Sequence, residues 1–130
     1  MTVSKEVQDA ARTLRGPVTV ADWQREVHAL AREKGWHPDG IDPRDPNRAL
    51  ALLMLVTTEL AEVAEDIRRG KWDAATEENG KPTGVPSELA DSVIRILDAC
   101  AAWGIDLEAA ISSKHEFNKT RPFRHGGKAV

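Results

Sequence analysis

The sequence predicts an all-α fold, a bundle of four or five helices in a single domain of 130 residues. Apolar residues recur three and four positions apart through most of the chain, which is the spacing of one helix face. Asp, Ser or Thr precedes several of these segments and Gly or Pro follows them, as at helix ends. Aromatic residues make up only 5% and Tyr is absent, so alanine and leucine form the core, which favours close helix packing. No segment has the pattern of a strand.

The N-terminal part of the chain is predicted to hold an extension (1–18) and one amphipathic helix. Apolar residues at helical spacing predict a short helical segment inside the extension: Val7, Ala10, Ala11 and Leu14. The next helix is expected to begin at Thr19, with Asp22 three residues on as an imperfect capping box, and to stop at Gly35. The segment 36–47 contains three prolines and is predicted to be a loop.

The longest predicted helix follows this loop. Asp45 is suited to cap it, Pro46 to occupy its first turn and Gly70 to end it. The polar segment 71–86 after it is rich in Gly and Pro and is expected to be a loop.

Two helices are predicted in the remaining chain. Ser87 is expected to cap a helix that ends near Gly104, and Asp106 a helix that runs to about Lys119. Pro122 is expected to stop this last helix, and residues 121–130 are expected to form a basic C-terminal tail.

Composition excludes several classes of protein. A net charge of −3 argues against binding to a nucleic acid polymer, which needs a basic face. The single cysteine, Cys100, cannot form an internal disulfide and suits a reducing compartment. No apolar run reaches about 18 residues, so no membrane span is expected. The N-terminus lacks the apolar core of a signal peptide, and a cytoplasmic protein is expected.

The longest helix carries a strip of acids along one edge of its apolar face. With Glu59 at zero, Glu62 falls near about 300° and Asp66 near about 340° on the helical wheel. Apolar side chains fill the neighbouring arc from about 20° to 120°: Leu52, Val63, Val56, Ile67, Leu60 and Leu53. Glu65 points elsewhere and is expected to be an ordinary solvated acid.

The following helix has a less regular pattern. With Glu88 at zero, Asp91 falls near about 300°, away from the centre of the apolar arc. That arc covers about 80° to 240° and holds five residues: Ile96, Cys100, Val93, Leu97 and Ile94. Arg95 lies between Glu88 and Asp98 and is placed to pair with either. Taken alone, this helix favours a solvated charged face.

Taken together, the two helices permit a metal site. If they lie antiparallel, each offers two acids three residues apart, so that four carboxylates face one groove: Glu59, Glu62, Glu88 and Asp91. Like charges at close range raise one another's pKa, and a hard divalent cation relieves this repulsion. Mg²⁺ prefers oxygen ligands and keeps room for water or phosphate oxygens. Solvated acidic faces remain the alternative interpretation.

Cationic and aromatic residues offer further candidates for ligand binding. Lys114 and Asn118 are four residues apart and share a face of the last helix, and basic residues of the tail follow: Arg121, Arg124, His125 and Lys128. Cations beside an acidic metal site suit a bound phosphate chain, although a solubilising tail has the same composition. Trp36, at the start of a loop, is able to stack on a base.

The order of these motifs resembles a known family. Glu59-x-x-Glu62 is followed after 25 residues by Glu88-x-x-Asp91, then by K-x-x-x-N from Lys114 and by R-P-x-x-H-G-G-K from Arg121. This ordered set is similar to the signature of the all-α nucleoside triphosphate pyrophosphohydrolases, the MazG-like family, in its short single-domain form. With the long helix, the resemblance covers roughly 80 residues and includes "GKPTGVPSELADSVIRILDACAAWGIDLEAAISSKHEFNKTRPFRHGGK".

The resemblance implies an enzyme that hydrolyses a (deoxy)nucleoside triphosphate to monophosphate and pyrophosphate. It implies that the catalytic Mg²⁺, with Mn²⁺ as a substitute, is held by four acids: Glu59, Glu62, Glu88 and Asp91. It implies phosphate and sugar contacts from the C-terminal residues Lys114, Asn118, Arg121, His125 and Lys128. It also implies a homodimer or a dimer of dimers. Arg95 and Asp98 are charged at positions where many relatives carry apolar residues, which is a departure from the family pattern.

Two other classes of helical protein are alternatives to this prediction. A di-iron bundle needs Glu-x-x-His, and none of the four histidines has Glu three residues before it. A non-catalytic helical oligomerisation or interaction module with solvated acidic faces stays open. That module gives no reason for the ordered acid, Lys and Asn motifs, and calorimetry of metal binding with and without nucleotide distinguishes it from the enzyme.

Overall fold

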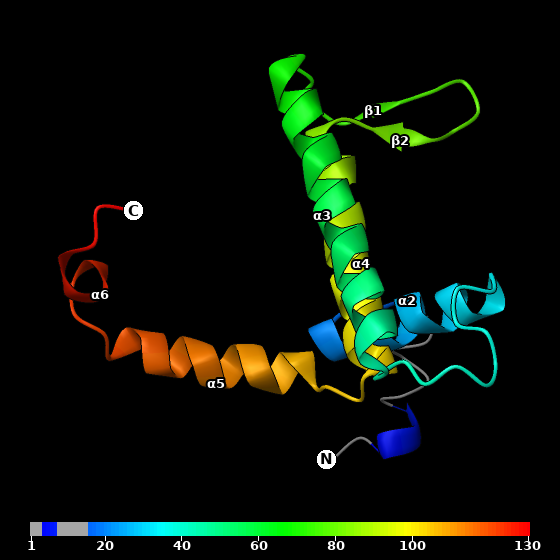
Figure 1. Cartoon of the computed structure of the whole chain (residues 1–130), viewed down its shortest axis with the longest axis horizontal. Coiled ribbons are helices and arrows are strands. Elements are labelled where there is room, and N and C mark those ends of the chain that lie inside the picture. Colours follow the sequence, from blue (N-terminus) through cyan, green and yellow to red (C-terminus); the bar gives the residue numbers. More distant parts are fainter. Residues whose placement is uncertain (1–3, 8–15) are drawn as a thin grey trace.

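The computed structural model describes residues 4–7 and 16–130 and is mostly helical, as the sequence predicts (Figure 1). Its main helices are α2 (Val20–Glu33), α3 (Pro46–Arg68), α4 (Val85–Ala102) and α5 (Leu107–Lys119). The tail contains a single turn, α6 (Arg124–Gly127). Most of the helical segment expected between Val7 and Leu14 lies outside the described residues. Over the described ranges, no helix combines the length and apolar composition that crossing a bilayer requires.

Side-chain caps fix the starts of three helices at the predicted residues. Thr19 Oγ1 accepts from the Asp22 N–H at 3.0 Å, and Asp22 Oδ2 accepts from the Thr19 N–H at 3.1 Å, so the imperfect capping box forms. Asp45 accepts from the N–H of Arg48, the third residue of α3, and Asp106 accepts from the N–H of Ala109, the third residue of α5. Each such cap is worth about 1 kcal/mol to its helix.

The cap predicted for α4 is wrong. The helix begins at Val85, and Ser87 lies inside its first turn, where Ser87 Oγ donates to the Pro82 carbonyl at 3.1 Å. Gly84 holds the N-cap position with φ 94°, and a Cβ there would lie 2.3 Å from the Asp73 carbonyl oxygen. This close approach allows only glycine, so the backbone at Gly84 sets the start of the helix in place of a side chain.

The segment between α3 and α4 also differs from the prediction of a loop without strands. Two short antiparallel strands, β1 (Ala75–Thr76) and β2 (Pro82–Thr83), pair Ala75 with Thr83 and Thr76 with Pro82. Gly80, with φ 86°, allows the turn between them. Strands of two residues are too short for an alternating pattern, which is why the sequence gives no sign of them.

Helices α3 and α4 form an antiparallel pair, and α2 packs across α4 near its C-terminal end (Figure 1). Helix α5 extends to one side, away from this pair, and carries α6 and the C-terminus at its far end. No residue of α5 is buried. Within the described residues, α2 and α3 therefore pack around α4, and α5 projects from them as an arm.

The core is small and lies between these helices. It consists of Leu52, Val56, Val63, Val85, Leu97, Ala99 and Cys100. Only part of the apolar arc predicted for α3 is buried, since Leu53 and Leu60 are half exposed. On α4 the buried stripe runs through Ser92 and Ala99, whereas Val93 is 53% exposed. The predicted apolar arc of α4 is thus split: Leu97 and Cys100 are buried together with Ser92 and Ala99, whereas Val93, Ile94 and Ile96 are exposed. Of the acids of this helix, Glu88 is half-buried and Asp91 is exposed.

Candidate functional site

The four predicted acids come together between α3 and α4. One carboxylate oxygen each from Glu59, Glu88 and Asp91 lies within 4.8 Å of the other two. Glu62 lies close enough to the Glu88 carboxyl to hydrogen-bond it. Glu59 is buried, with 9% of its surface exposed. The antiparallel pairing of the helices aligns the two motifs, since each places its acids three residues apart on the facing side.

Glu88 has the most perturbed environment of these acids. Burial is the first cause that raises its pKa, to about 7, followed by the hydrogen bond with Glu62 and the charges of Glu62, Asp91 and Asp66. Apart from the contact with the Glu62 carboxyl, its buried Oε2 atom has no hydrogen-bond partner among residues 4–7 and 16–130. A buried oxygen without a partner is unusual, because such groups are normally satisfied.

The pKa of Asp91 is raised as well. Burial is again the main cause and the Glu59 charge the next, while the charges of Arg95 and Lys81 act in the opposite direction. The site therefore resists full ionisation because its acids repel one another and are partly removed from water.

The donor atoms fit a hard divalent cation. All of them are carboxylate oxygens, which Mg²⁺ prefers, and the unpartnered Glu88 Oε2 gains a partner when a cation binds there. Glu59, Glu88 and Asp91 would hold the ion, with Glu62 beside them.

Arg95 does not pair with Glu88 or Asp98, as the sequence suggested, but with Glu59. Its Nε donates to Glu59 Oε1 at 2.5 Å, and its guanidinium lies 5.8 Å from the centre of the Trp36 ring. Arg95 stands one turn beyond Asp91 on the side of α4 that faces α3, so it reaches across the helix interface. It neutralises part of the acidic charge and connects the carboxylates to an aromatic side chain.

A pocket of about 750 Å³ adjoins the acids. Trp23, Trp36 and Leu30 supply apolar walls, and Glu59 and Asp91 stand at its acidic side. Both tryptophans are about half exposed, so their rings are accessible to a ligand. Sites for small molecules commonly combine apolar and aromatic walls with a few polar groups, and a nucleoside fits this volume. Trp36 was predicted as a ligand contact, whereas Trp23 was not among the predicted site residues.

The predicted substrate contacts at the C-terminus lie away from the acids within one chain. Lys114 and Asn118 are on the projecting α5, and the tail at its far end carries Arg121, His125 and Lys128 (Figure 1). Hydrogen bonds to α2 occur only near the start of α5, where the Leu107 N–H donates to Gln24 Oε1 at 3.3 Å. The Lys114 ammonium lies 5.4 Å from the Phe117 ring centre on the same helix. A single chain thus does not bring these groups to the carboxylates.

Comparisons of the chain with protein-family models, with curated proteins and with solved structures found no match. The function therefore has to be inferred from the carboxylates of α3 and α4 and the aromatic pocket beside them.

Proposed function

We propose that the protein is a Mg²⁺-dependent nucleotide pyrophosphohydrolase with a MazG-like helical fold, which cleaves (deoxy)nucleoside triphosphates to monophosphate and pyrophosphate. The observation that carries this proposal is the convergence of Glu59, Glu88 and Asp91, with one buried unpartnered oxygen, beside a pocket of about 750 Å³. A cation site that adjoins an aromatic pocket suits a ligand with a phosphate chain at one end and a base at the other.

The chain's own residues divide into two groups in this proposal. Glu59, Glu88 and Asp91 would hold the ion, Mg²⁺ or in its place Mn²⁺, with Glu62 beside them. When bound, such an ion binds phosphate oxygens and makes a coordinated water more acidic. Trp23 and Trp36 bracket the base, which they are able to do by stacking because every base has a flat aromatic face.

Arg95 has a positioning role in the same proposal. It donates to Glu59 Oε1 at 2.5 Å, so that we expect Glu59 to bind the ion through its other oxygen. Arg95 also lies over Trp36. A base bound against Trp36 and an ion bound by Glu59 would therefore both affect the Arg95 guanidinium.

The cationic residues require a second copy of the chain. We place Lys114 and Asn118 of one copy against the phosphates bound by another, with the tail residues Arg121, His125 and Lys128 joining them. Support comes from the absence of buried residues in α5 and from the exposed apolar side chains of α3 and α4, including Leu53, Leu60 and Val93. A homodimer or a dimer of dimers covers such surfaces.

The same exposed surfaces favour a second candidate, a non-catalytic helical interaction module. This candidate accounts for the uncovered apolar side chains and for α5. It gives no reason for the buried, unpartnered oxygen of Glu88.

A panel of canonical and modified nucleoside triphosphates, assayed for pyrophosphate release with Mg²⁺ and with EDTA, tests the proposal. We expect release from at least one nucleotide with Mg²⁺ and none with EDTA. Glu88→Gln should abolish it, whereas Glu78→Gln, which changes an exposed acid of the β1–β2 turn, should not. Mg²⁺ binding by calorimetry should tighten with nucleotide. Absence of both metal binding and release would favour the interaction module.

A further inference from the structure

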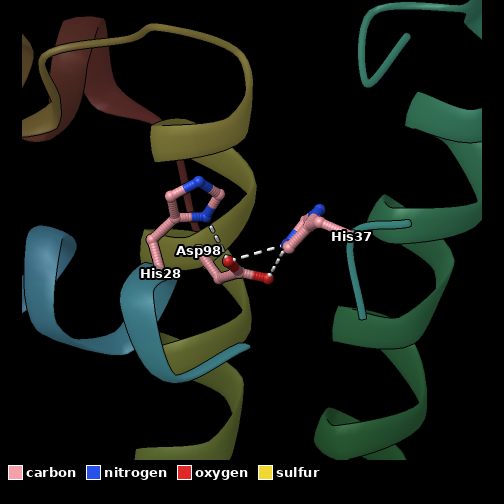
Figure 2. A group of neighbouring side chains, drawn as sticks. All are labelled: His28, His37 and Asp98. Carbon is pink, nitrogen blue, oxygen red and sulfur yellow. Dashed lines mark hydrogen bonds and ion pairs between the residues drawn. The ribbon is translucent and has the colours of Figure 1, made fainter. Parts of the chain in front are cut away.

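A second group of side chains with metal-ligating chemistry lies outside the acidic site. Figure 2 shows His28, from α2, and His37, from the following loop, on either side of Asp98 of α4. Asp98 Oδ1 accepts from His28 Nδ1 at 2.7 Å, and Asp98 Oδ2 accepts from His37 Nε2 at 2.8 Å. The three side chains are 21%, 11% and 14% exposed respectively. One ligand atom of each lies within 4.8 Å of the other two.

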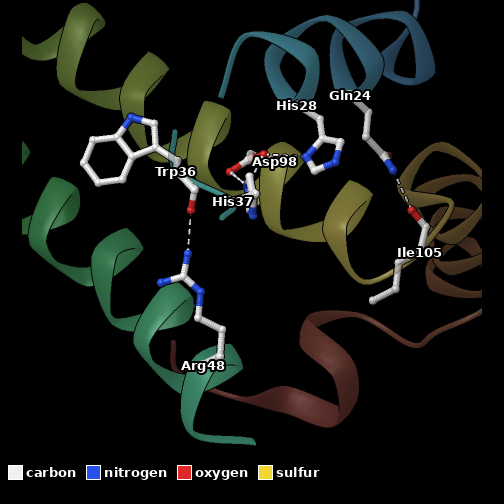
Figure 3. Close-up of polar contacts among 7 residues, drawn as sticks. All are labelled: Gln24, His28, Trp36, His37, Arg48, Asp98 and Ile105. Carbon is white, nitrogen blue, oxygen red and sulfur yellow. Dashed lines mark hydrogen bonds and ion pairs between the residues drawn. The ribbon is translucent and has the colours of Figure 1, made fainter. Parts of the chain in front are cut away.

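Polar contacts hold the histidine-bearing segments in place. On the loop side, Arg48 Nη2 donates to the Trp36 carbonyl at 2.6 Å, next to His37 (Figure 3). On the α2 side, Gln24 Nε2 donates to the Ile105 carbonyl at 2.6 Å, one turn before His28. The three ligands therefore come from segments that are fixed before any ion binds, which reduces the ordering cost of binding.

We propose that His28, His37 and Asp98 form a second metal site, for a first-row transition ion of the Zn²⁺ class. Two imidazole nitrogens and one carboxylate are a donor set that such ions favour, whereas Mg²⁺ requires oxygen donors. Metal–ligand bonds of about 2.0–2.2 Å place two ligand atoms on one ion roughly 3–4 Å apart. The present spacing needs only small side-chain movements to reach this geometry.

Binding of an ion moves the proton of each imidazole from one ring nitrogen to the other. In the arrangement shown, the nitrogens that face Asp98 donate hydrogen bonds to its carboxylate, so each carries a proton. An ion in that position bonds to the same nitrogens, and each neutral imidazole then carries its proton on the other nitrogen. The carboxylate changes from accepting two hydrogen bonds to ligating the ion.

The site has space for a further ligand. A pocket of about 330 Å³ is lined by His28 and His37 together with Arg32 and Asp39. Three protein ligands with an accessible fourth position are typical of zinc sites that bind water or a small ligand, in contrast to closed structural sites.

The two proposed ions would occupy separate places. Asp98 lies seven residues after Asp91 on α4, about 10 Å further along the helix axis. The second site therefore does not depend on the proposed nucleotide chemistry, and its metal preference differs from that of the carboxylates.

The test uses the full chain, freed of metal with EDTA and then held in excess Mg²⁺ so that the acidic site is saturated. Zn²⁺ is titrated by calorimetry, and Co²⁺ is followed by its visible absorption. We expect one equivalent of either ion to bind. His37→Ala should weaken Zn²⁺ binding by more than about 100-fold, since loss of an outer-shell partner alone costs 10–100-fold. His115→Ala, on exposed α5, should leave Zn²⁺ binding unchanged.

A spectroscopic measurement on the unaltered protein avoids dependence on variants that fail to fold. Long-range ¹H–¹⁵N spectra of the imidazoles should show Zn²⁺ shifting His28 Nδ1 and His37 Nε2 and leaving His115 unaffected. The proposal is overturned if wild type binds no Zn²⁺ in the presence of Mg²⁺. It is equally overturned if His37→Ala keeps the wild-type affinity, or if Zn²⁺ leaves the His28 and His37 signals in place.

Discussion

Replacing Glu88 by Gln should stabilise the protein in the absence of metal at high pH and not at low pH. The pKa of Glu88 is raised by burial and by its carboxylate neighbours, from 4.5 to about 7. At a pH between these two values, Glu88 keeps its proton in the folded state and has lost it in the unfolded chain. The free energy of unfolding therefore falls as the pH rises through this window. Gln keeps the shape, carries no charge and can donate to Glu62.

The size of the effect follows from the pKa difference. A difference of about 2.5 corresponds to roughly 3 kcal/mol at about 1.4 kcal/mol for each pKa unit, as an upper limit. Glu88 retains contact with solvent, and screening there reduces the value to about 1 kcal/mol. For a chain of this length that is a rise of roughly 3–5 °C in Tm.

Thermal and urea unfolding in EDTA, at about pH 4.5 and about pH 8, measure this effect. Wild type and Glu88→Gln should have nearly equal stability at the lower pH, and the variant should be more stable at the higher pH. Adding Mg²⁺ at about one hundred times its Kd should stabilise wild type by about 2.7 kcal/mol and the variant by much less. Glu78→Gln serves as the control. A gain for Glu88→Gln that is equal at both pH values would refute the reasoning, because it could not arise from ionisation.

The catalytic, pocket, tail and core assignments each have a direct test. Glu59→Gln should remove pyrophosphate release while circular dichroism stays unchanged; wild-type turnover would contradict the assignment. Trp36→Ala should raise KM with little change in Tm, whereas Trp72→Ala, outside the pocket, should leave KM unchanged. Deleting residues 121–130 should raise KM and hardly alter Tm; unchanged kinetics would make the tail a solubilising appendage. Burial raises the pKa of the Cys100 thiol, so alkylation should be slow in the native protein and fast in denaturant.

Helix positions were predictable where a side chain sets the boundary. Thr19, Asp45 and Asp106 accept backbone hydrogen bonds at their helix starts, as predicted from residue type and spacing. Gly84 was missed because its role depends on the Asp73 carbonyl, eleven residues earlier in the chain, which approaches it only in three dimensions.

The packing of α4 was not predictable for a different reason. A helical wheel tells which residues share a face but not which face meets a neighbouring helix. The Ser92 and Ala99 side packs inward because small side chains let α3 approach closely, and that approach brings Glu88 next to Glu59 and Glu62. The interpretation of the acids of α4 as a solvated charged face assumed that the apolar arc of this helix is the buried one.

The His28, His37 and Asp98 group shows the limit of sequence spacing. Neither His28 nor His37 was among the predicted site residues, and Asp98 was noted only as a charge that departs from the family pattern. The two histidines are nine residues apart, across a helix end, and Asp98 is sixty-one residues further on, so no short motif joins them. Only the crossing of α2 over α4 brings them together.

The projecting helix has a consequence for hydrogen exchange. α5 has 13 residues, none buried, and helices of this length are marginal on their own in water. Its tertiary hydrogen bonds to the other described residues lie in its first two positions, where the Leu107 N–H donates to Gln24 and Glu108 accepts from Ala21. Its amides should therefore open with little free energy, and protection should fall from Leu107 towards Lys119. If the protection of amides in the C-terminal half of α5 rises with protein concentration, this rise would show that a second copy of the chain covers the helix.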